Sequence, residues 1–264
     1  GRMIEPEDIL SAVKDFFFER PLKGLRAVVT SGPTYEPIDP VRFLGNRSSG
    51  KQGHAIAQQL IKVGAEVTYI TGPTNLPAPN ATKTVFVESA QEMLNAVEEA
   101  LPSQIFIGAA AVCDWGVGSV NAQKLKKEAG NTPSLSLKEN PDILKTVANH
   151  DRRPELVIGF AAETEDLKNN AENKIKRKNC DWLVGNDVSP AQNIFGSDEN
   201  QVCLFKYTDD RKSITDQDWP RMTKIQVASK LVEEITHHFE NIKGRNNDSA
   251  NNTIADGTIS RVAE

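Results

Sequence analysis

Short apolar runs alternate with segments of helical periodicity along this chain, and no other feature of the sequence restricts its fold as strongly. Residues 104–109 are almost wholly apolar, which is typical of a strand covered on both faces of a parallel sheet. Strands are predicted at residues 25–30, 65–70, 84–87, 104–109, 156–160 and 181–185. Because helical patterns separate these strands, we expect an α/β fold with a Rossmann-like, doubly wound and mainly parallel sheet.

Helices are predicted between these strands and at both ends of the repeat. The spacing of Ser89 and Glu92 is that of a capping box, and Pro141 suits a first helical turn. The predicted helices cover residues 7–18, 50–63, 89–101, a segment opened by 140–143, 165–178 and 223–239. The repeat breaks down at 189–215, where one or two short strands are expected. Residues 243–264 hold almost no large apolar groups and are predicted to be disordered.

Composition excludes several classes of protein. The 264 residues carry a net charge of −5, which is a poor match to a non-specific nucleic-acid binder with its basic face. No apolar run reaches the roughly 18 residues of a membrane-spanning helix, and the first residues lack the features of a signal peptide. The three cysteines and four histidines show no metal-ligand spacing. We therefore expect a cytoplasmic protein with reduced thiols, without a zinc site and without a membrane or nucleic-acid partner.

Ligands of an open parallel sheet bind at the carboxyl ends of its strands, and the first such segment here is residues 30–53. Its Gly-x4-Gly-Lys spacing mimics a P-loop, but Gln52 stands where a P-loop needs a Ser or Thr for Mg²⁺. The main-chain amides of Ser48, Ser49 and Gly50 could instead bind a phosphate at a helix start. A long loop closed by a serine N-cap is the alternative interpretation.

A second segment follows the apolar strand at 104–109. Its small residues Gly108, Ala109 and Ala110 would let a flat ring or a phosphate approach the backbone. Asp114 lies at the predicted mouth of this strand, where it could hold Mg²⁺ or a nucleotide donor. A turn-capping role for Asp114 is equally open.

Two further segments concentrate positive charge. Lysines occupy positions 124, 126 and 127, and a later run at 174–178 holds three lysines and one arginine. Short runs of this kind usually form solvated faces. A run that follows a sheet mouth could instead neutralise a triphosphate.

Together these segments resemble one enzyme family. In chain order they read SGPTYEPIDPVRFLGNRSSGKQG, AAAVCDW, KLKK, NPDIL, GFAAET and NDV. The series resembles the phosphopantothenate–cysteine ligases, which form the carboxyl-terminal half of a bifunctional bacterial protein of coenzyme A biosynthesis. The resemblance implies a ligase domain at residues 23–242. Residues 1–22 would be a linker and helix from the junction with a flavin-dependent decarboxylase, so FMN is expected only if that half is present.

The resemblance implies a two-step ligation. The carboxylate of 4′-phosphopantothenate attacks the α-phosphate of CTP, which gives an acyl-cytidylate and pyrophosphate. The amine of L-cysteine then displaces CMP and forms the amide of 4′-phosphopantothenoylcysteine. Because a carboxylate and a triphosphate repel each other, the first step needs cations and Mg²⁺ at the developing charge.

The family's functional residues carry over onto matching positions. Lys124, the first lysine of the KxKK motif, is implied in forming the acyl-cytidylate, and Asn46 in holding it for the second step. Asp114 is implied near the nucleotide and its metal. The other implied nucleotide contacts are Gly108, Ala109, Ala110, Pro141, Asp142, Ile143, Leu144, Phe160, Lys174 and Lys178. Cys113 and Trp115 depart from the commoner Ala and Tyr of the family.

Family members are dimers, so we expect a homodimer, with pairing strands supplied by residues 189–215. Two other hypotheses are open. A short-chain oxidoreductase would need GxGxxG or a Tyr-x3-Lys pair, and none of Tyr35, Tyr69 and Tyr207 has a lysine four positions on. A non-enzymatic nucleotide-binding module would bind CTP without turnover.

Overall fold

The computed structural model describes residues 19–126, 134–163, 166–187, 198–208 and 210–256. The predicted helix at 7–18 and Lys127 of the KxKK motif lie outside these residues.

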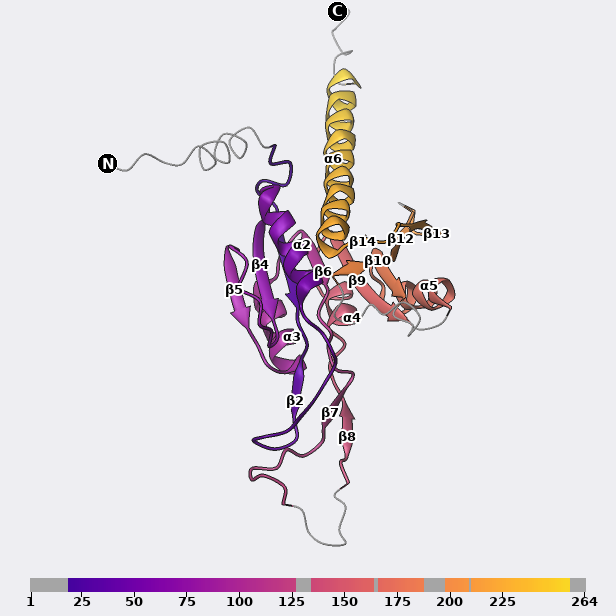
Figure 1. Ribbon diagram of the computed structural model, residues 1–264. Coiled ribbons are helices and arrows are strands. Elements are labelled where there is room, and N and C mark those ends of the chain that lie inside the picture. The colour runs from indigo at the N-terminus through magenta and orange to yellow at the C-terminus, as the bar shows by residue number, and fades with distance from the viewer. Residues whose placement is uncertain (1–18, 127–133, 164–165, 188–197, 209, 257–264) are drawn as a thin grey trace, which may run out of the picture.

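An eight-stranded sheet forms the centre of the protein (Figure 1). Its strands are β1 (Arg26–Ser31), β4 (Glu66–Thr71), β5 (Lys83–Phe86), β6 (Ile105–Gly108), β9 (Leu156–Glu163), β10 (Trp182–Asp187), β12 (Val202–Tyr207) and β13 (Ile214–Asp218). The strand order is β13–β12–β10–β9–β6–β1–β4–β5. The six strands from β10 to β5 are parallel, and β12 and β13 extend the sheet in antiparallel fashion. The predicted Rossmann-like, mainly parallel sheet is confirmed.

Helices cover both faces of this sheet. One buried cluster joins the sheet to α2 (Lys51–Lys62) and α6 (Lys224–Asp256). A second cluster joins the opposite face to α3 (Ala90–Ala100), α4 (Ile143–Ala148) and α5 (Leu167–Lys178). Burial of each large aliphatic side chain contributes roughly 1.5–3 kcal/mol, so two apolar faces explain why the central strands have no polar side.

Helix α6 is longer than its sequence pattern predicts. It continues to Asp256, so the prediction of disorder is wrong for residues 243–256, and residues 257–264 lie outside the described part. Elongation of an existing helix adds one hydrogen bond per residue without a new nucleation cost. A polar composition therefore does not end a helix that already rests on the sheet.

Two hairpins project from the carboxyl edge of the sheet and are called the arm here. The first pairs β2 (Tyr35–Pro37) with β3 (Phe43–Gly45), and the second pairs β7 (Trp115–Val117) with β8 (Leu137–Glu139). β2 and β3 both pack against β7, and Figure 1 shows β2, β7 and β8 extending away from the helices. The arm also includes the loops at 38–42 and 118–126.

The predicted short strands at 189–215 are present in the described part of that region. β11 (Glu199–Asn200) pairs with β14 (Met222–Thr223), while β12 and β13 belong to the main sheet. Their predicted use in pairing with a second copy stays a prediction. Within the described residues, none of the helices is both long and apolar enough to traverse a bilayer.

Candidate functional site

A cavity of about 1430 Å³ opens at the carboxyl edge of the sheet. Thr30 of β1, Gly108 of β6, Phe160 of β9 and Asn186 of β10 all contribute to its wall. This edge is where open α/β sheets bind their ligands. The volume exceeds the roughly 300–1,000 Å³ of a typical small-molecule pocket, so the cavity has room for more than one substrate.

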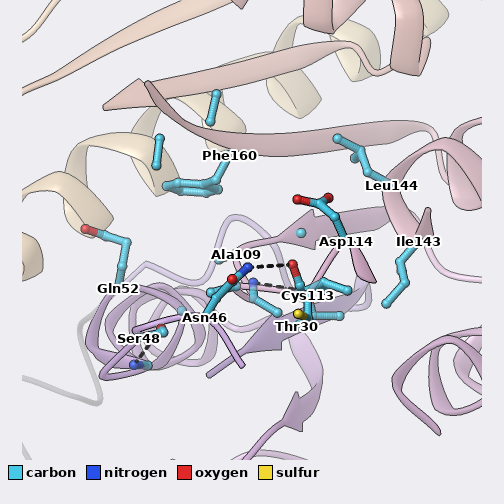
Figure 2. A pocket seen from close by; sticks show the side chains of 18 of the residues that line it. Thr30, Asn46, Ser48, Gln52, Ala109, Cys113, Asp114, Ile143, Leu144 and Phe160 are labelled. Carbon is cyan, nitrogen blue, oxygen red and sulfur yellow. Dashed lines mark hydrogen bonds between the residues drawn. The ribbon is translucent and has the colours of Figure 1, made fainter. Parts of the chain in front are cut away.

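The cavity brings together almost every residue that the sequence singles out. Asn46, Ser48, Ser49, Gly50, Gly108, Ala109, Ala110, Asp114, Pro141, Asp142, Ile143, Leu144, Phe160, Lys174 and Lys178 all line it. In Figure 2, Phe160 and Gln52 lie on one side, Asp114, Ile143 and Leu144 on the other, and Asn46 between them. The predicted residue that the cavity does not include is Lys124.

The small-residue segment after β6 is hydrogen-bonded along the end of β1. The amide of Ala109 donates to the carbonyl of Thr30 at 3.2 Å, and that of Ala111 to the carbonyl of Gly32 at 2.8 Å. The amide of Cys113 donates to Oγ1 of Thr34 at 2.9 Å. These amides are already used, so a ligand meets the small side chains of this wall rather than its N–H groups.

The side chain of Asn46 is oriented by this same wall. Its Nδ2 donates to the carbonyl oxygen of Val112 at 2.9 Å, although the residue is exposed (Figure 2). Because the nitrogen faces Val112, the amide presents its acceptor oxygen in a defined direction.

Gly50, which has φ 70°, is the N-cap of helix α2. The amide of Gly50 donates to Oγ of Ser48 at 3.2 Å, so the serine N-cap alternative is wrong and this amide is already engaged. The first-turn residues Lys51, Gln52 and Gly53 also line the cavity. First-turn amides of a helix have no intrahelical acceptor, and a helix N-terminus favours an anion.

The segment before α4 is attached to the mouth of β6. The amide of Asn140 donates to the carbonyl of Asp114 at 2.9 Å, and its Nδ2 donates to the carbonyl of Cys113 at 2.9 Å. Asp142 caps α4 by accepting from the amide of Lys145 at 3.1 Å. The predicted turn and helix at 140–143 thereby form a second wall beside Asp114.

Charge in the cavity is biased towards an anionic ligand. Its lining holds five cationic side chains, Arg47, Lys51, Lys174, Lys178 and Lys224, and three anionic ones, Asp114, Glu139 and Asp142. The whole chain, in contrast, carries a net charge of −5. Burial, and then the nearby charge of Lys51, lower the pKa of Lys224. An anion bound here would oppose that shift and stabilise the charged lysine.

Comparison with known proteins gives the family. Residues 22–239 match the family described as DNA/pantothenate metabolism flavoprotein C-terminal domain. The chain belongs to this family. It is 44% identical over 242 residues to the coenzyme A biosynthesis bifunctional protein CoaBC of Haemophilus influenzae, which covers 91% of this chain and 58% of that protein. The chain thus spans less than two thirds of the length of the curated relatives it matches.

Two solved structures have folds similar to that of this chain. The crystal structure of the C-terminal domain of a CoaBC protein has a TM-score of 0.69 and 36% identity, and the match covers 84% of this chain and all of that one. A Cab2 mutant solved in complex with phosphopantothenate-cysteine has a TM-score of 0.61 at 17% identity, covering 91% and 92% of the two chains. The second likeness concerns the fold alone.

In this family member Lys124 belongs to the arm and not to the cavity. The side chain of Lys124 is exposed. On one side of it, the amide of Asn121 donates to the carbonyl of Ile38 at 3.0 Å. On the other side, the amide of Leu125 donates to Oδ2 of Asp39 at 3.1 Å. The sequence does not indicate this placement, because it depends on contacts between distant loops.

A metal at Asp114 would need partners beyond the protein. Within the described residues, the one group of three potential ligands is Cys203, Asp216 and Asp218, and Lys168 Nζ lies 2.6 Å from Asp216 there. Asp114 is exposed in the cavity. Mg²⁺ in nucleotide sites is commonly held by one or two carboxylates together with substrate phosphates, so the carboxylate of Asp114 would fit this ion beside a bound phosphate.

Sequence analysis missed a chain of amides along another wall of the cavity. Gln52 Nε2 donates to the carbonyl of Lys224 at 3.2 Å, Asn200 Nδ2 approaches Gln52 Oε1 at 3.4 Å, and Asn186 Nδ2 approaches Asn200 Oδ1 at 3.3 Å. Asn186 belongs to the NDV motif, so the sequence does point to this one member of the chain of amides. Asn200 and Lys224 lie beyond the repeating pattern, where nothing in the sequence points to the cavity.

Proposed function

We propose that this chain is the ligase that joins 4′-phosphopantothenate to L-cysteine through an acyl-cytidylate formed from CTP. The observation that carries the proposal is one cavity at the sheet edge that gathers Asn46, Asp114 and the two lysines of α5 under an excess of positive charge. The bifunctional coenzyme A name of its relatives supports the reaction class. The complex of a similarly folded protein with phosphopantothenate-cysteine supports the substrate class.

The first step requires two anions to approach each other. In the proposed arrangement the triphosphate lies at the start of α2, against the first-turn amides and Lys51. The phosphopantothenate carboxylate attacks the α-phosphorus, a new P–O bond forms, and pyrophosphate leaves with the electron pair of the broken P–O bond. Cationic side chains placed beforehand lower this barrier because they need no reorganisation as charge develops.

The nucleoside half is assigned to the wall made by residues 141–144 and Phe160. Phe160 is partly exposed in the cavity and can stack on a planar ring. Ile143 is buried beneath, so the main chain there is well supported. Lys178 pairs with Asp142 at this wall, and Lys174 lies one helical turn earlier.

The second step is assigned to Asn46. With its Nδ2 donating to the carbonyl of Val112, its Oδ1 can accept a hydrogen bond from the N–H of the L-cysteine amine as that amine attacks the acyl carbon. The C–N bond forms, the acyl C–O bond breaks, and CMP leaves with that electron pair on its phosphate oxygen, while the amine loses a proton to solvent or to the leaving phosphate. An amide suits this position because it adds no negative charge beside the acyl-phosphate.

Mg²⁺ fits the single carboxylate of Asp114 beside the proposed phosphates. When bound, the ion would neutralise phosphate charge and polarise the α-phosphate. A cytoplasmic location is a further part of the proposal. A fused decarboxylase half, with FMN only if that half is present, is another part, and the bifunctional name of the relatives supports it.

We also propose that the protein is a homodimer and that the arm contributes to the contact, in addition to the pairing strands predicted at 189–215. Large apolar side chains are exposed on the arm, including Val41 at 60%, Phe43 at 51%, Trp115 at 50% and Leu137 at 51%. Exposed apolar groups that cluster in this way mark interaction surfaces. Phe43 and Trp115 also line the cavity. A second copy packed against these two side chains would cover the cavity of the first copy, and the Lys124 of the second copy could reach into it.

One assay tests the proposed function. Purified chain is incubated with CTP or ATP and Mg²⁺, with and without 4′-phosphopantothenate and L-cysteine, and pyrophosphate and CMP are measured. The expected result is pyrophosphate release that requires phosphopantothenate, is faster with CTP, and gives the amide only with cysteine. Pyrophosphate release that ignores phosphopantothenate, or tight NADPH binding by fluorescence, would contradict the proposal.

A further inference from the structure

The carboxylate of Asp39 lies where the two loops of the arm meet. The residue is only 3% exposed, although it belongs to a projecting hairpin. Its Oδ1 accepts from the amide of Val41 at 2.8 Å and from that of Arg42 at 3.0 Å. Its Oδ2 accepts from the Arg42 guanidinium, with Nε at 2.9 Å, and from the amide of Leu125 at 3.1 Å. This group is called the Asp39 clasp.

Only a carboxylate suits the Asp39 clasp. Every group that reaches the side chain is a donor: two amides on Oδ1, and two guanidinium nitrogens and one amide on Oδ2. An ionised aspartate accepts at both oxygens, whereas an asparagine must present an NH₂ group to one of these sets. Replacement by Asn would therefore set donor against donor and open one side of the clasp.

The clasp fixes the backbone on both sides of Lys124. Arg42 Nη2, besides binding Asp39, donates to the carbonyl of Leu125 at 2.7 Å. The amide of Asn121 donates to the carbonyl of Ile38 at 3.0 Å. Because the Lys124 side chain is itself exposed, these backbone contacts determine where its amine can reach.

The same clasp is linked to Asn46. Strand β3 (Phe43–Gly45) leads directly from Arg42 to Asn46, and it pairs with β2 across the hairpin that Asp39 closes. One buried carboxylate thus connects the loop of Lys124 with the strand that leads into Asn46.

We propose that Asp39 is a positioning residue that holds Lys124 in place for acyl-cytidylate formation. The inference rests on the role proposed above for Lys124, and it goes beyond that role by naming the group that sets the lysine's position. It holds whether Lys124 serves the cavity of its own chain or that of a second copy, since the clasp is internal to one arm.

Ionisation supports the clasp at neutral pH. Hydrogen bonds from the Arg42 side chain are the largest effect, and they hold the pKa of Asp39 well below its ordinary value. Burial acts in the opposite direction, and the amide of Val41 lowers the pKa further. Asp39 is therefore fully charged under assay conditions.

The test is the first half-reaction of Asp39→Asn. Pyrophosphate release is followed in a single turnover with CTP and phosphopantothenate and without cysteine. A drop of about tenfold or more is expected, because displacing a reacting group by about 1 Å can cost up to about 10²-fold. CTP affinity by calorimetry should stay within about twofold of the wild type, since Asp39 does not line the cavity.

Asp210→Asn is the matched control. Asp210 also closes a turn, but it lies in the β12–β13 connection, so this variant should keep the wild-type rate.

A double-mutant cycle separates positioning from a general structural effect. In a Lys124→Gln background, Asp39→Asn should slow the first step by less than about twofold, because the group that it positions is already gone. If the two losses multiply, Asp39 acts independently of Lys124 and the inference is overturned. An unchanged rate for Asp39→Asn overturns it equally, while the proposed function stands. A full-rate Lys124→Gln would instead remove the proposed role of Lys124, and this inference with it.

Leu125→Pro provides a second variant if Asp39→Asn folds poorly. Proline has no N–H, so this change removes one bond from Lys124's side of the clasp and leaves the Asp39–Arg42 pair intact. Like Asp39→Asn, this variant should lower the rate of the first step, but its Tm should change less than that of Asp39→Asn. A Leu125→Pro variant with the wild-type first-step rate would contradict the clasp.

Discussion

The sheet edge and the arm position their functional groups in different ways. At the sheet edge, the strands themselves bring Gly108, Asp114 and Phe160 to one cavity, and backbone hydrogen bonds from Ala109 and Ala111 join neighbouring strand ends. The arm has exposed apolar side chains and is held by the Asp39 clasp. The difference indicates that the fold itself fixes the wall of the cavity, whereas local contacts within the arm fix the position of the proposed reactive lysine.

The largest expected effect comes from removing the arm's lysine. Lys124→Ala should slow acyl-cytidylate formation by about 10²–10³-fold, the loss typical for one preorganised electrostatic group, while CTP binding to the cavity is retained. Pyrophosphate release with CTP and phosphopantothenate measures the step. Lys212→Ala, an exposed lysine of the β12–β13 connection, is the control and should match the wild type. Full activity of Lys124→Ala would show that the lysine of the arm takes no part in acyl-cytidylate formation.

A change at the sheet edge should affect the other step. Asn46→Asp should leave the first step largely intact and slow cysteine capture by about 10²-fold, because a carboxylate repels the acyl-phosphate and loses the donor to Val112. Quenched reactions analysed by mass spectrometry should show the acyl-cytidylate accumulating. The control is Asn95→Asp on the outer side of α3, where Asn95 accepts a hydrogen bond from Gln91. This variant should not accumulate the acyl-cytidylate. Loss of both steps together would argue against separate roles for the two regions.

A methyl group at the start of α2 tests how tightly the sheet edge is packed. A Cβ on Gly53 would lie 2.5 Å from Oγ of Ser31 in β1, so Gly53→Ala should destabilise the fold by roughly 1–3 kcal/mol. Denaturant unfolding measures the loss. In Gly244→Ala the new Cβ meets nothing within 4 Å, and that helical change should be neutral or slightly stabilising. Equal stability of the two variants would show that the sheet edge tolerates movement.

The smallest effect concerns the stability of the arm against acid. Hydrogen bonding, first of all from Arg42, lowers the pKa of Asp39 from its ordinary value of 3.8. Below that value the unfolded chain takes up a proton that the folded chain does not. The ionised carboxylate of Asp39 therefore contributes fully to the free energy of unfolding above about pH 4, and its contribution is lost as the pH falls further. The Tm difference between wild type and Asp39→Asn should therefore shrink from pH 6 to pH 2. A constant difference would mean that the charge of Asp39 contributes nothing.

Much of the sheet edge could be predicted because it depends on short-range patterns. Apolar runs located the six parallel strands, and parallel topology alone requires the segments after β1, β6 and β9 to meet at one edge. Asn46 and Asp114 lie in the segments after β1 and β6 and were therefore predicted near one another, whereas Phe160 was added by the family resemblance; all three line one cavity.

The arm could not be predicted in the same way because its contacts are distant in sequence. Asp39 and Leu125 are 86 positions apart, and neither loop has a periodic pattern. The amide chain from Gln52 to Asn200 joins residues 148 positions apart. The length of α6 was missed for another reason, since composition reports the cost of ordering but not the advantage of extending an existing helix.

Mixed dimers test most directly whether the sheet edge of one copy works with the arm of another. Lys124→Ala and Asn46→Asp chains, each inactive alone, are unfolded together at equal amounts, refolded and assayed for the complete reaction. If Lys124 serves the partner's cavity, half of the dimers are mixed and one site in each is intact, so activity should recover to about a quarter of the wild type. No recovery, in a mixture shown by mass spectrometry to contain mixed dimers, would contradict the account.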